Sequence, residues 1–149
     1  MKIDIFPHIY PERYFDRIFS RSGPGLDMQN RFREIPVLTD LELRFRIMDQ
    51  YGDYAQVLTL SSPPIEALGT PQETPELARL ANDGMAELVE KYPDRFPGFV
   101  ASMPMNNPEA ALKEIDRAVT DLGATGIQIF SNVKGRPLDE PEFQPLFRS

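Results

Sequence analysis

The stretch Met-Lys-Ile-Asp-Ile-Phe-Pro-His at residues 1–8 decides the fold of this chain. Residues 2–6 are typical of a short strand, because apolar Ile3 and Ile5 alternate with charged side chains. The strand runs into a proline and then His8, the only histidine in the sequence. An aspartate and a histidine near the end of an opening strand are how many barrel enzymes begin a metal site.

Three later segments repeat the strand pattern, and amphipathic helix patterns separate them. Strands are predicted at residues 54–60, 96–102 and 126–130, and helices at residues 11–19, 39–51, 74–92 and 107–122, with another helix beginning at 145–147. Thr74-Pro75-Glu76 and Asn107-Pro108-Glu109 each combine a cap residue, a first-turn proline and an acid. Gly52 and Gly123 stand where helix C-caps belong. Alternating strands and helices predict a parallel sheet with right-handed crossovers.

The number of strand–helix units bounds the fold class. Four units make half of an eight-stranded barrel, which usually needs roughly 250 residues, whereas this chain has 149. A dinucleotide-binding sheet fits less well, because the turn after the first strand, FPHIYP at residues 6–11, lacks glycine. We therefore expect an α/β fold, the N-terminal half of a (β/α)8 TIM barrel, as one partial domain over residues 1–149 that continues beyond Ser149. A complete small α/β domain is the alternative.

Composition and charge exclude several classes of function. The net charge of −7 leaves no basic face for a nucleic acid, and no run approaches the roughly 18 apolar residues of a membrane span. The absence of cysteine excludes disulfides, thiolate zinc sites and cysteine nucleophiles. No signal peptide is recognisable, so we expect a soluble cytoplasmic protein. Bare outer strands of a half barrel would favour a homo-oligomer.

Four segments together resemble one known family. They are residues 2–8, KIDIFPH, against a family pattern D-x-H-x-H; residues 44–57, RFRIMDQYGDYAQV; residues 92–96, YPDRF, with the strand after them; and residues 122–129, LGATGIQI, with GRPLD at 135–139. Each segment alone is a weak signal, but their order and spacing are specific. Over essentially its whole length, the chain resembles the amidohydrolase-related proteins of the aminocarboxymuconate-semialdehyde decarboxylase type.

The resemblance implies a distorted TIM barrel and a metal-dependent enzyme, usually a zinc enzyme, that decarboxylates or hydrolyses aromatic or unsaturated carboxylates. In such enzymes the metal activates water and orients the substrate carboxylate. Asp4 and His8 match the family pattern, whereas Phe6 stands where the first metal-binding histidine belongs and cannot bind a metal. The resemblance places the other ligands, a histidine and an aspartate, after Ser149. We therefore expect residues 1–149 alone to bind no metal and to be inactive.

The candidate site residues lie at predicted strand ends. His8 is the candidate metal ligand or general acid–base, with a hydrogen-bonded loop residue as the alternative. Phe6 is expected in the wall of a substrate pocket, and Asp4 as a residue that orients a neighbour. Position at the carboxyl ends of strands suggests the remaining substrate-binding candidates, which are Ser61, Met103 and Asn132, with Ser131 beside them.

Two further features have competing interpretations, and so has the function. Arg44, on a predicted helix, could reach a substrate carboxylate, but a solvated ion pair is the stronger expectation. The segment from Ser20 to Asn30 could be a lid or a plain exposed loop. The whole protein would be a metal-dependent carboxy-lyase or hydrolase acting on a small carboxylate. The alternatives are a non-catalytic ligand-binding or structural relative, whose metal site degenerated at Phe6, and a complete small α/β binding domain.

Overall fold

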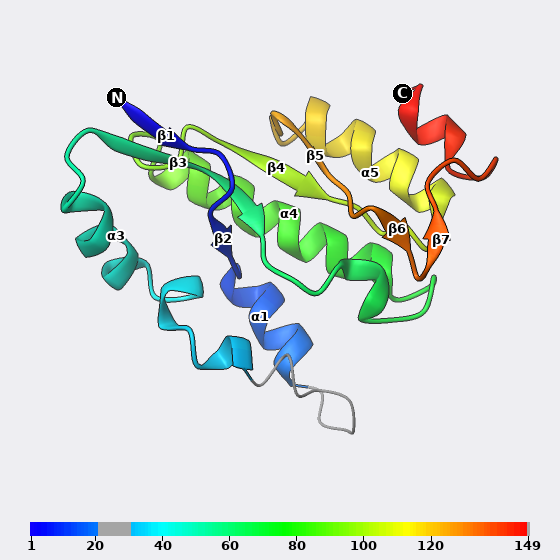
Figure 1. Cartoon of the computed structure of the whole chain (residues 1–149), viewed down its shortest axis with the longest axis horizontal. Helices are drawn as coiled ribbons and strands as arrows, with labels where there is room; N and C mark the ends of the chain where they lie inside the picture. Colours follow the sequence, from blue (N-terminus) through cyan, green and yellow to red (C-terminus); the bar gives the residue numbers. More distant parts are fainter. Residues whose placement is uncertain (21–30, 149) are drawn as a thin grey trace.

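The computed structural model describes residues 1–20 and 31–148. Its main sheet is parallel and has the strand order β1–β3–β4–β5, with β2 also paired to β3 (Figure 1). The strands are β1 (Lys2–Asp4), β2 (His8–Ile9), β3 (Tyr54–Leu60), β4 (Gly98–Ser102) and β5 (Gly126–Gln128). This order and direction confirm the half-barrel sheet predicted from the sequence. Of the segment suggested as a lid, residues 21–30 lie outside the described residues.

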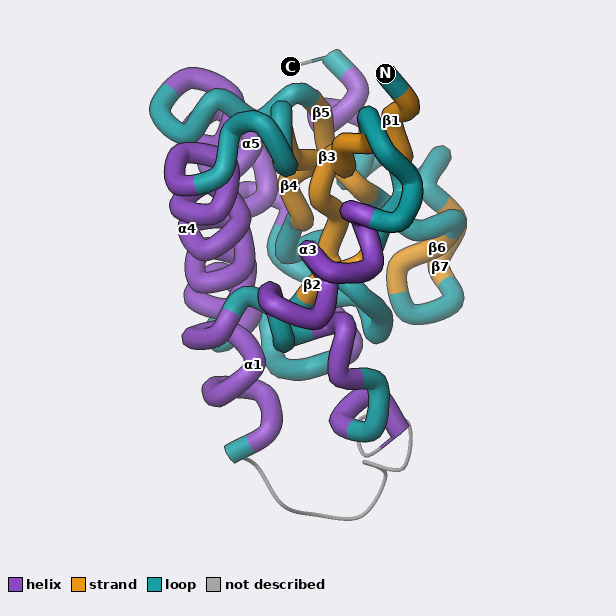
Figure 2. Tube along the Cα trace, turned by 90° about the vertical axis from the view of Figure 1, so that its left-hand side faces the viewer, coloured by secondary structure: helices purple, strands orange, loops and turns teal. Residues whose placement is uncertain are grey.

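Helices follow or precede the strands as the apolar periodicity predicts. They are α1 (Glu12–Phe19), α3 (Leu41–Asp49), α4 (Thr74–Lys91) and α5 (Pro108–Thr120), with short 3₁₀ turns η1 (Pro36–Leu38), η2 (Ile65–Ala67) and η3 (Gln144–Phe147). The helix expected from residue 145 is thus a single 3₁₀ turn. Figure 2 shows α4 and α5 side by side along one face of the sheet. No helix within residues 1–20 and 31–148 is long and apolar enough to cross a membrane.

Helix ends follow the local sequence, with one correction. The Asn107 side chain accepts a hydrogen bond from the first turn of α5 at 3.1 Å, as its cap position predicts. Thr74 does not cap α4, because it is already helical and fully buried, and its hydroxyl donates to Asn106 Oδ1 at 2.7 Å. Gly52 and Gly123 have φ angles of 71° and 70°, the left-handed conformation expected after a helix.

The first strand departs from the prediction, because a bulge interrupts it. Asp4 pairs with Gln56, and His8 pairs with Thr59. Three residues of the first strand therefore lie opposite two residues of β3, which defines a bulge with one extra residue. The proline at position 7 fits this interruption, because it has no N–H for the ladder. The predicted strand at 2–6 thus ends at Asp4, and the chain re-enters the sheet at His8.

The two faces of the sheet differ in what covers them. Leu58 and Phe99 are fully buried in the hydrophobic core, which also contains residues of α4. Paired residues of parallel strands point to the same face, and successive residues alternate. The register therefore places His8 and Thr59 on the opposite face, together with Gln128, which pairs with Ser102. The second face carries the candidate chemistry of the chain.

A short antiparallel hairpin after β5 was not predicted. It consists of β6 (Asn132–Val133) and β7 (Arg136–Pro137), and the strand predicted to continue to residue 130 ends at Gln128. Lys134 and Gly135, between the hairpin strands, have φ angles of 52° and 84°. Positive φ at both central residues is typical of a two-residue hairpin turn. The Lys-Gly pair was the available sequence signal.

Candidate functional site

His8 lies where the bulge ends and β2 begins. Its Nδ1 is 3.2 Å from the Leu60 carbonyl oxygen and 3.1 Å from Thr59 Oγ1. The Thr59 hydroxyl donates its own proton to the Pro7 carbonyl at 2.8 Å, and a carbonyl can only accept. Nδ1 therefore carries the imidazole proton. In this tautomer of the neutral ring Nε2 bears the lone pair, and it has no hydrogen-bond partner in the described part of the chain, as a metal ligand requires.

A buried arginine holds the backbone at His8. Arg44 of α3 is 3% exposed and donates to the His8 carbonyl, to Gln56 Oε1 at 2.7 Å and to the Val37 carbonyl at 3.0 Å. Burial lowers the pKa of the guanidinium, while Tyr54 and Asp4 oppose that shift. The solvated ion pair expected from the sequence is therefore wrong, because the side chain points into the protein toward neutral oxygens. Arg44 positions His8 through its main chain.

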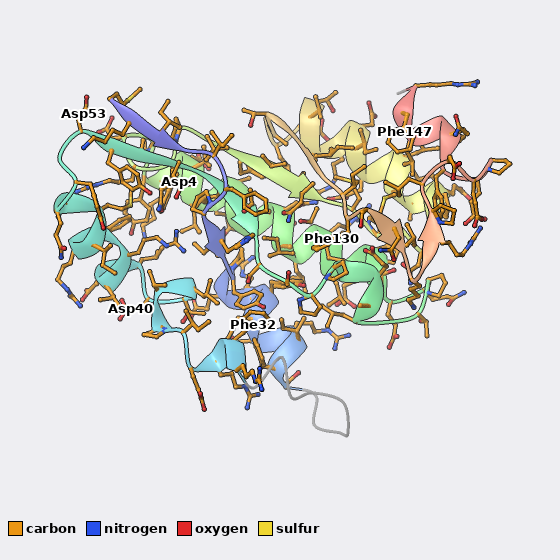
Figure 3. The ribbon with its side chains drawn as sticks, viewed as in Figure 1. Asp4, Phe32, Asp40, Asp53, Phe130 and Phe147 are labelled. Carbon is orange, nitrogen blue, oxygen red and sulfur yellow. The ribbon has the colours of Figure 1, made fainter. Side chains whose placement is uncertain are left out.

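Asp4 joins the same network from the other side of the bulge. Gln56 Nε2 donates to the Tyr54 hydroxyl at 3.2 Å, and this hydroxyl donates to Asp4 Oδ2 at 2.9 Å. The other Asp4 oxygen accepts the Phe6 backbone N–H at 3.0 Å. Figure 3 shows Asp4 between β1 and β3. The carboxylate thus secures the start of the bulge, which agrees with the orienting role expected from its position.

Phe6 lies on the bulge and is 63% exposed. Its ring meets the His8 ring edge-on, with centroids 4.7 Å apart and an interplanar angle of 69°. It lines neither the cavity at the carboxyl ends of β3, β4 and β5 nor the one between α1, α3 and α4. Phe6 is therefore a neighbour of the imidazole, and its place in a substrate pocket stays a prediction.

A small cavity lies at the carboxyl ends of β3, β4 and β5. Its volume of about 10 Å³ is close to the minimum that one water molecule needs. Two predicted substrate-binding residues, Ser61 and Met103, line it. Phe130 also lines it, and Figure 3 shows this residue beside the segment that follows β3. The structure thus brings Ser61 and Met103 together at the expected end of the sheet, and their binding role stays a prediction.

Asn132 does not join this cavity. It lies in the β6–β7 hairpin, where its Oδ1 accepts the Gly135 backbone N–H at 2.8 Å. Its side chain is exposed, and its amide contacts Ser131 Oγ at 3.5 Å. The hairpin therefore uses the Asn132 side chain for its own turn. A substrate-binding role for Asn132 also stays a prediction, without support from the cavity.

Two polar residues of the cavity were missed by sequence reasoning. Glu66 of η2 is 2% exposed, and both its Oε1 and Gln128 Oε1 are buried without a hydrogen-bond partner among residues 1–20 and 31–148. Burial raises the pKa of the Glu66 carboxyl, while its own backbone N–H and the charge of Lys134 oppose that shift. The available signals were a glutamate inside the apolar segment after β3 and a glutamine inside an apolar strand. Neither signal is specific without the tertiary structure.

The described residues do not by themselves form a metal site. Within residues 1–20 and 31–148, no group of three or more histidine, cysteine, aspartate or glutamate side chains is placed to hold a metal ion. His8 offers one nitrogen, whereas a catalytic zinc usually has three protein ligands. Phe6, at the position of the first histidine of the family pattern, offers no donor atom. Any metal would therefore need further ligands besides His8.

A parallel half-barrel sheet flanked by helices is the N-terminal half of the TIM-barrel fold. Among proteins with this fold, the profile of the amidohydrolase family matches residues 31–149. The chain belongs to this amidohydrolase family, which confirms the resemblance drawn from the sequence segments.

Individual relatives narrow the comparison. The chain is 38% identical to the 2-amino-3-carboxymuconate-6-semialdehyde decarboxylase of Dictyostelium discoideum, over 99% of this chain and 45% of the relative. It is 39% identical to a gamma-resorcylate decarboxylase of a Polaromonas species, over 70% of this chain and 30% of the relative. The crystal structure of 5-carboxyvanillate decarboxylase from Novosphingobium aromaticivorans superposes with a TM-score of 0.83 and 31% identity, over 99% of this chain and 46% of that structure.

These relatives indicate which kind of function to consider, and their length limits what can be said of this chain. The crystal structure of the 5-carboxyvanillate decarboxylase contains manganese and 4-hydroxy-3-methoxy-5-nitrobenzoic acid. All three relatives are decarboxylases, so the comparisons do not favour a non-catalytic relative. The chain spans about half the length, or less, of the relatives that it matches.

Proposed function

We propose that the protein to which this chain belongs is a metal-dependent decarboxylase of a small aromatic or unsaturated carboxylate. The observation that carries the proposal is the 38% identity to a decarboxylase over 99% of the chain. Hydrolysis, the other reaction expected from the resemblance, has less support, because the three relatives described above are decarboxylases. The metal is proposed to be divalent; the resemblance favours zinc, whereas a related structure contains manganese.

His8 is proposed to supply one metal ligand through Nε2. The contacts of Nδ1 to Leu60 and Thr59 support this role, because they fix the tautomer and the orientation of the ring. A bound metal in such enzymes stabilises negative charge and orients the substrate carboxylate. Ser61 and Met103 are proposed to contact the substrate at the carboxyl ends of the strands. Cytoplasmic location, association between copies and the absence of a nucleic-acid partner stay predictions from composition.

The proposal can be tested on the full-length protein. We expect elemental analysis to find a divalent metal, and carbon dioxide release from hydroxy- or amino-benzoates to depend on it. His8→Asn keeps an N–H that can reach the Leu60 carbonyl but loses Nε2, so metal content and activity should fall by about a hundredfold or more. Glu87→Gln, at an exposed position of α4, should change neither.

Two results would contradict parts of the proposal. Full activity in a metal-free protein would exclude the metal-dependent mechanism. A protein without activity on any carboxylate, in which Phe6→His creates new metal binding, would instead identify a degenerated site in a non-catalytic relative.

A further inference from the structure

Gly84 of α4 and Pro11, the residue before α1, lie closer together than two side chains could. A methyl group built on Gly84 would be 2.4 Å from Pro11 Cβ and 3.2 Å from Pro11 Cγ. Carbon atoms in contact are ordinarily about 3.5–4.0 Å apart. A Cβ atom at position 84 therefore requires that Pro11 or α4 moves by about 1 Å.

Helix formation does not explain this glycine. Gly84 lies inside α4 (Thr74–Lys91), and its backbone is helical, with no positive φ angle. Alanine is favoured over glycine at such a position, because glycine loses more backbone freedom on folding. The close approach of Pro11 is therefore the feature of the structure that accounts for the missing side chain.

The helix side of this contact is tied to the sheet. Asn82, two residues before Gly84, is fully buried and hydrogen-bonds the main chain of Ser102 at the end of β4. Pro11 instead borders a cavity of about 680 Å³ between α1, α3 and α4, so it has room to move away from α4. A side chain at position 84 would therefore displace Pro11 and leave α4 in place.

Only two residues, Ile9 and Tyr10, separate Pro11 from His8. Both are held by main-chain hydrogen bonds: the Ile9 carbonyl accepts an N–H from the residue after β3 at 3.2 Å, and the Tyr10 N–H donates to η1 at 2.8 Å. Each residue has only two soft backbone angles, and residues held in this way cannot rotate freely. A displacement of Pro11 is therefore transmitted to β2 and to the hydrogen bonds of the His8 ring.

We propose that Gly84 is a positioning residue for His8. Its missing side chain lets Pro11 pack against α4, and this contact fixes the short chain that carries the imidazole. The importance of the ring for catalysis rests on the proposed function, whereas the contact itself does not. A misplacement of about 1 Å can cost roughly a hundredfold in rate, so Gly84 would control activity through the main chain alone.

NMR of the ring nitrogens reports on His8 without requiring turnover or a bound metal. The full-length protein is isotope-labelled at histidine, and the His8 signals are identified by their loss in His8→Asn. At about pH 8.5 a histidine ring is ordinarily neutral, so the spectrum distinguishes its two tautomers. In Gly84→Ala we expect the His8 signals to move toward the average of the two tautomers, and carbon dioxide release to fall by about tenfold to a hundredfold.

A second substitution relieves the contact and tests it directly. Pro11→Gly removes the two atoms closest to the new methyl group and leaves Pro11 Cα at 3.8 Å, an ordinary contact. In the Pro11→Gly background, Gly84→Ala should therefore leave the His8 signals unchanged and raise the unfolding temperature, because alanine favours a helix. In the wild-type background the same substitution should lower the unfolding temperature.

Two control variants separate positioning from general loosening. Gly126→Ala makes the same exchange where no described atom beyond the adjacent residues lies within 4 Å of the new methyl group. Leu112→Ala removes core packing from α5, which lies away from α1 in Figure 1. Both variants should leave the His8 signals unchanged.

The outcomes distinguish this inference from the proposed function. Unchanged His8 signals with a higher unfolding temperature in Gly84→Ala would overturn the inference, and so would an equal change of the signals in Leu112→Ala. If Gly84→Ala does not fold, Pro11→Gly decides, because it removes the same contact: moved His8 signals support the inference, and wild-type signals overturn it. A wild-type protein that decarboxylates no carboxylate would overturn the proposed function, and the NMR comparison would still test the positioning.

Discussion

The two faces of the main sheet are made by alternate residues of the same strands, and they have different physical roles. On the face that belongs to the core, Leu58 and Phe99 are fully buried and apolar. On the opposite face, His8 Nδ1 contacts Thr59 Oγ1, and Gln128 Oε1 has no hydrogen-bond partner in the part of the chain that the structure describes. The comparison shows that, because successive side chains of a strand point to opposite faces, one face of the sheet can stabilise the core while the other carries polar groups.

Polar contacts across the core face support the chemical face. Asn82 of α4 is fully buried, and its side-chain amide donates to the Ser102 carbonyl at 3.0 Å and accepts the Ser102 N–H at 2.8 Å. Asn82 also donates to Glu114 Oε1 at 2.7 Å. These bonds fix the end of β4, where the cavity lies. The helix layer therefore contributes to the site by holding strand ends in place.

The largest expected effect compares neighbouring residues on opposite faces of β4. Phe99→Ala should reduce the free energy of unfolding by about 3–5 kcal/mol, because it leaves a large cavity in the core. Val100→Ala removes a half-buried side chain from the other face and should cost about 1 kcal/mol. Urea unfolding of this chain measures both. Equal losses would show that the second face is packed as tightly as the first.

The next effect concerns the arginine that holds His8. Arg44→Met leaves the His8 and Val37 carbonyls and Gln56 Oε1 without a donor inside the protein, so unfolding free energy should fall by about 2–3 kcal/mol. Arg46→Met, at an exposed position of the same helix, should change it by less than about 0.5 kcal/mol. Denaturant unfolding of Arg44→Met and Arg46→Met measures both changes in the free energy of unfolding. Similar small changes would show that Arg44 does not support the strand.

A smaller effect depends on pH. The folded-state pKa of Glu66 is raised above its ordinary 4.5 by burial, so ionisation of this carboxyl destabilises the folded protein. Relative to Glu66→Gln, the wild type should be most stable below pH 4.5 and should lose that advantage as the pH rises through the raised pKa. Thermal unfolding of both proteins between pH 4 and 7 measures the difference. A difference that is constant with pH would show that Glu66 is not buried in its charged form.

The smallest expected effect on stability is at the centre of the chemical face. His8→Asn should change the free energy of unfolding by less than about 1 kcal/mol, because Nε2 has no partner within residues 1–20 and 31–148 and asparagine can still donate to Leu60. The measurement is urea unfolding of the chain. A loss as large as that of Phe99→Ala would identify His8 as a structural residue instead of a functional one.

The sequence predicted the sheet order, the helices and the place of two cavity residues, because these follow from periodicity and from strand ends. It did not predict the bulge at residues 5–7, since the apolar alternation continues through it. It also gave the wrong environment for Arg44, because charge alone suggests solvent. The burial of Glu66 depends on residues that are distant in the chain. The role of the Asn132 side chain depends on the geometry of the hairpin turn, which the sequence analysis did not predict.

The sequence by itself determined a parallel half-barrel sheet of the amidohydrolase family, because hydrophobic periodicity and four ordered segments are properties of the chain. It also determined that Phe6 offers no metal ligand where the family pattern has a histidine. Only the tertiary structure decided the tautomer of His8, the buried network that runs from Arg44 to Asp4, and the meeting of Glu66 with Gln128. These depend on which donors and acceptors folding brings together away from water, and that pairing is not encoded in local sequence.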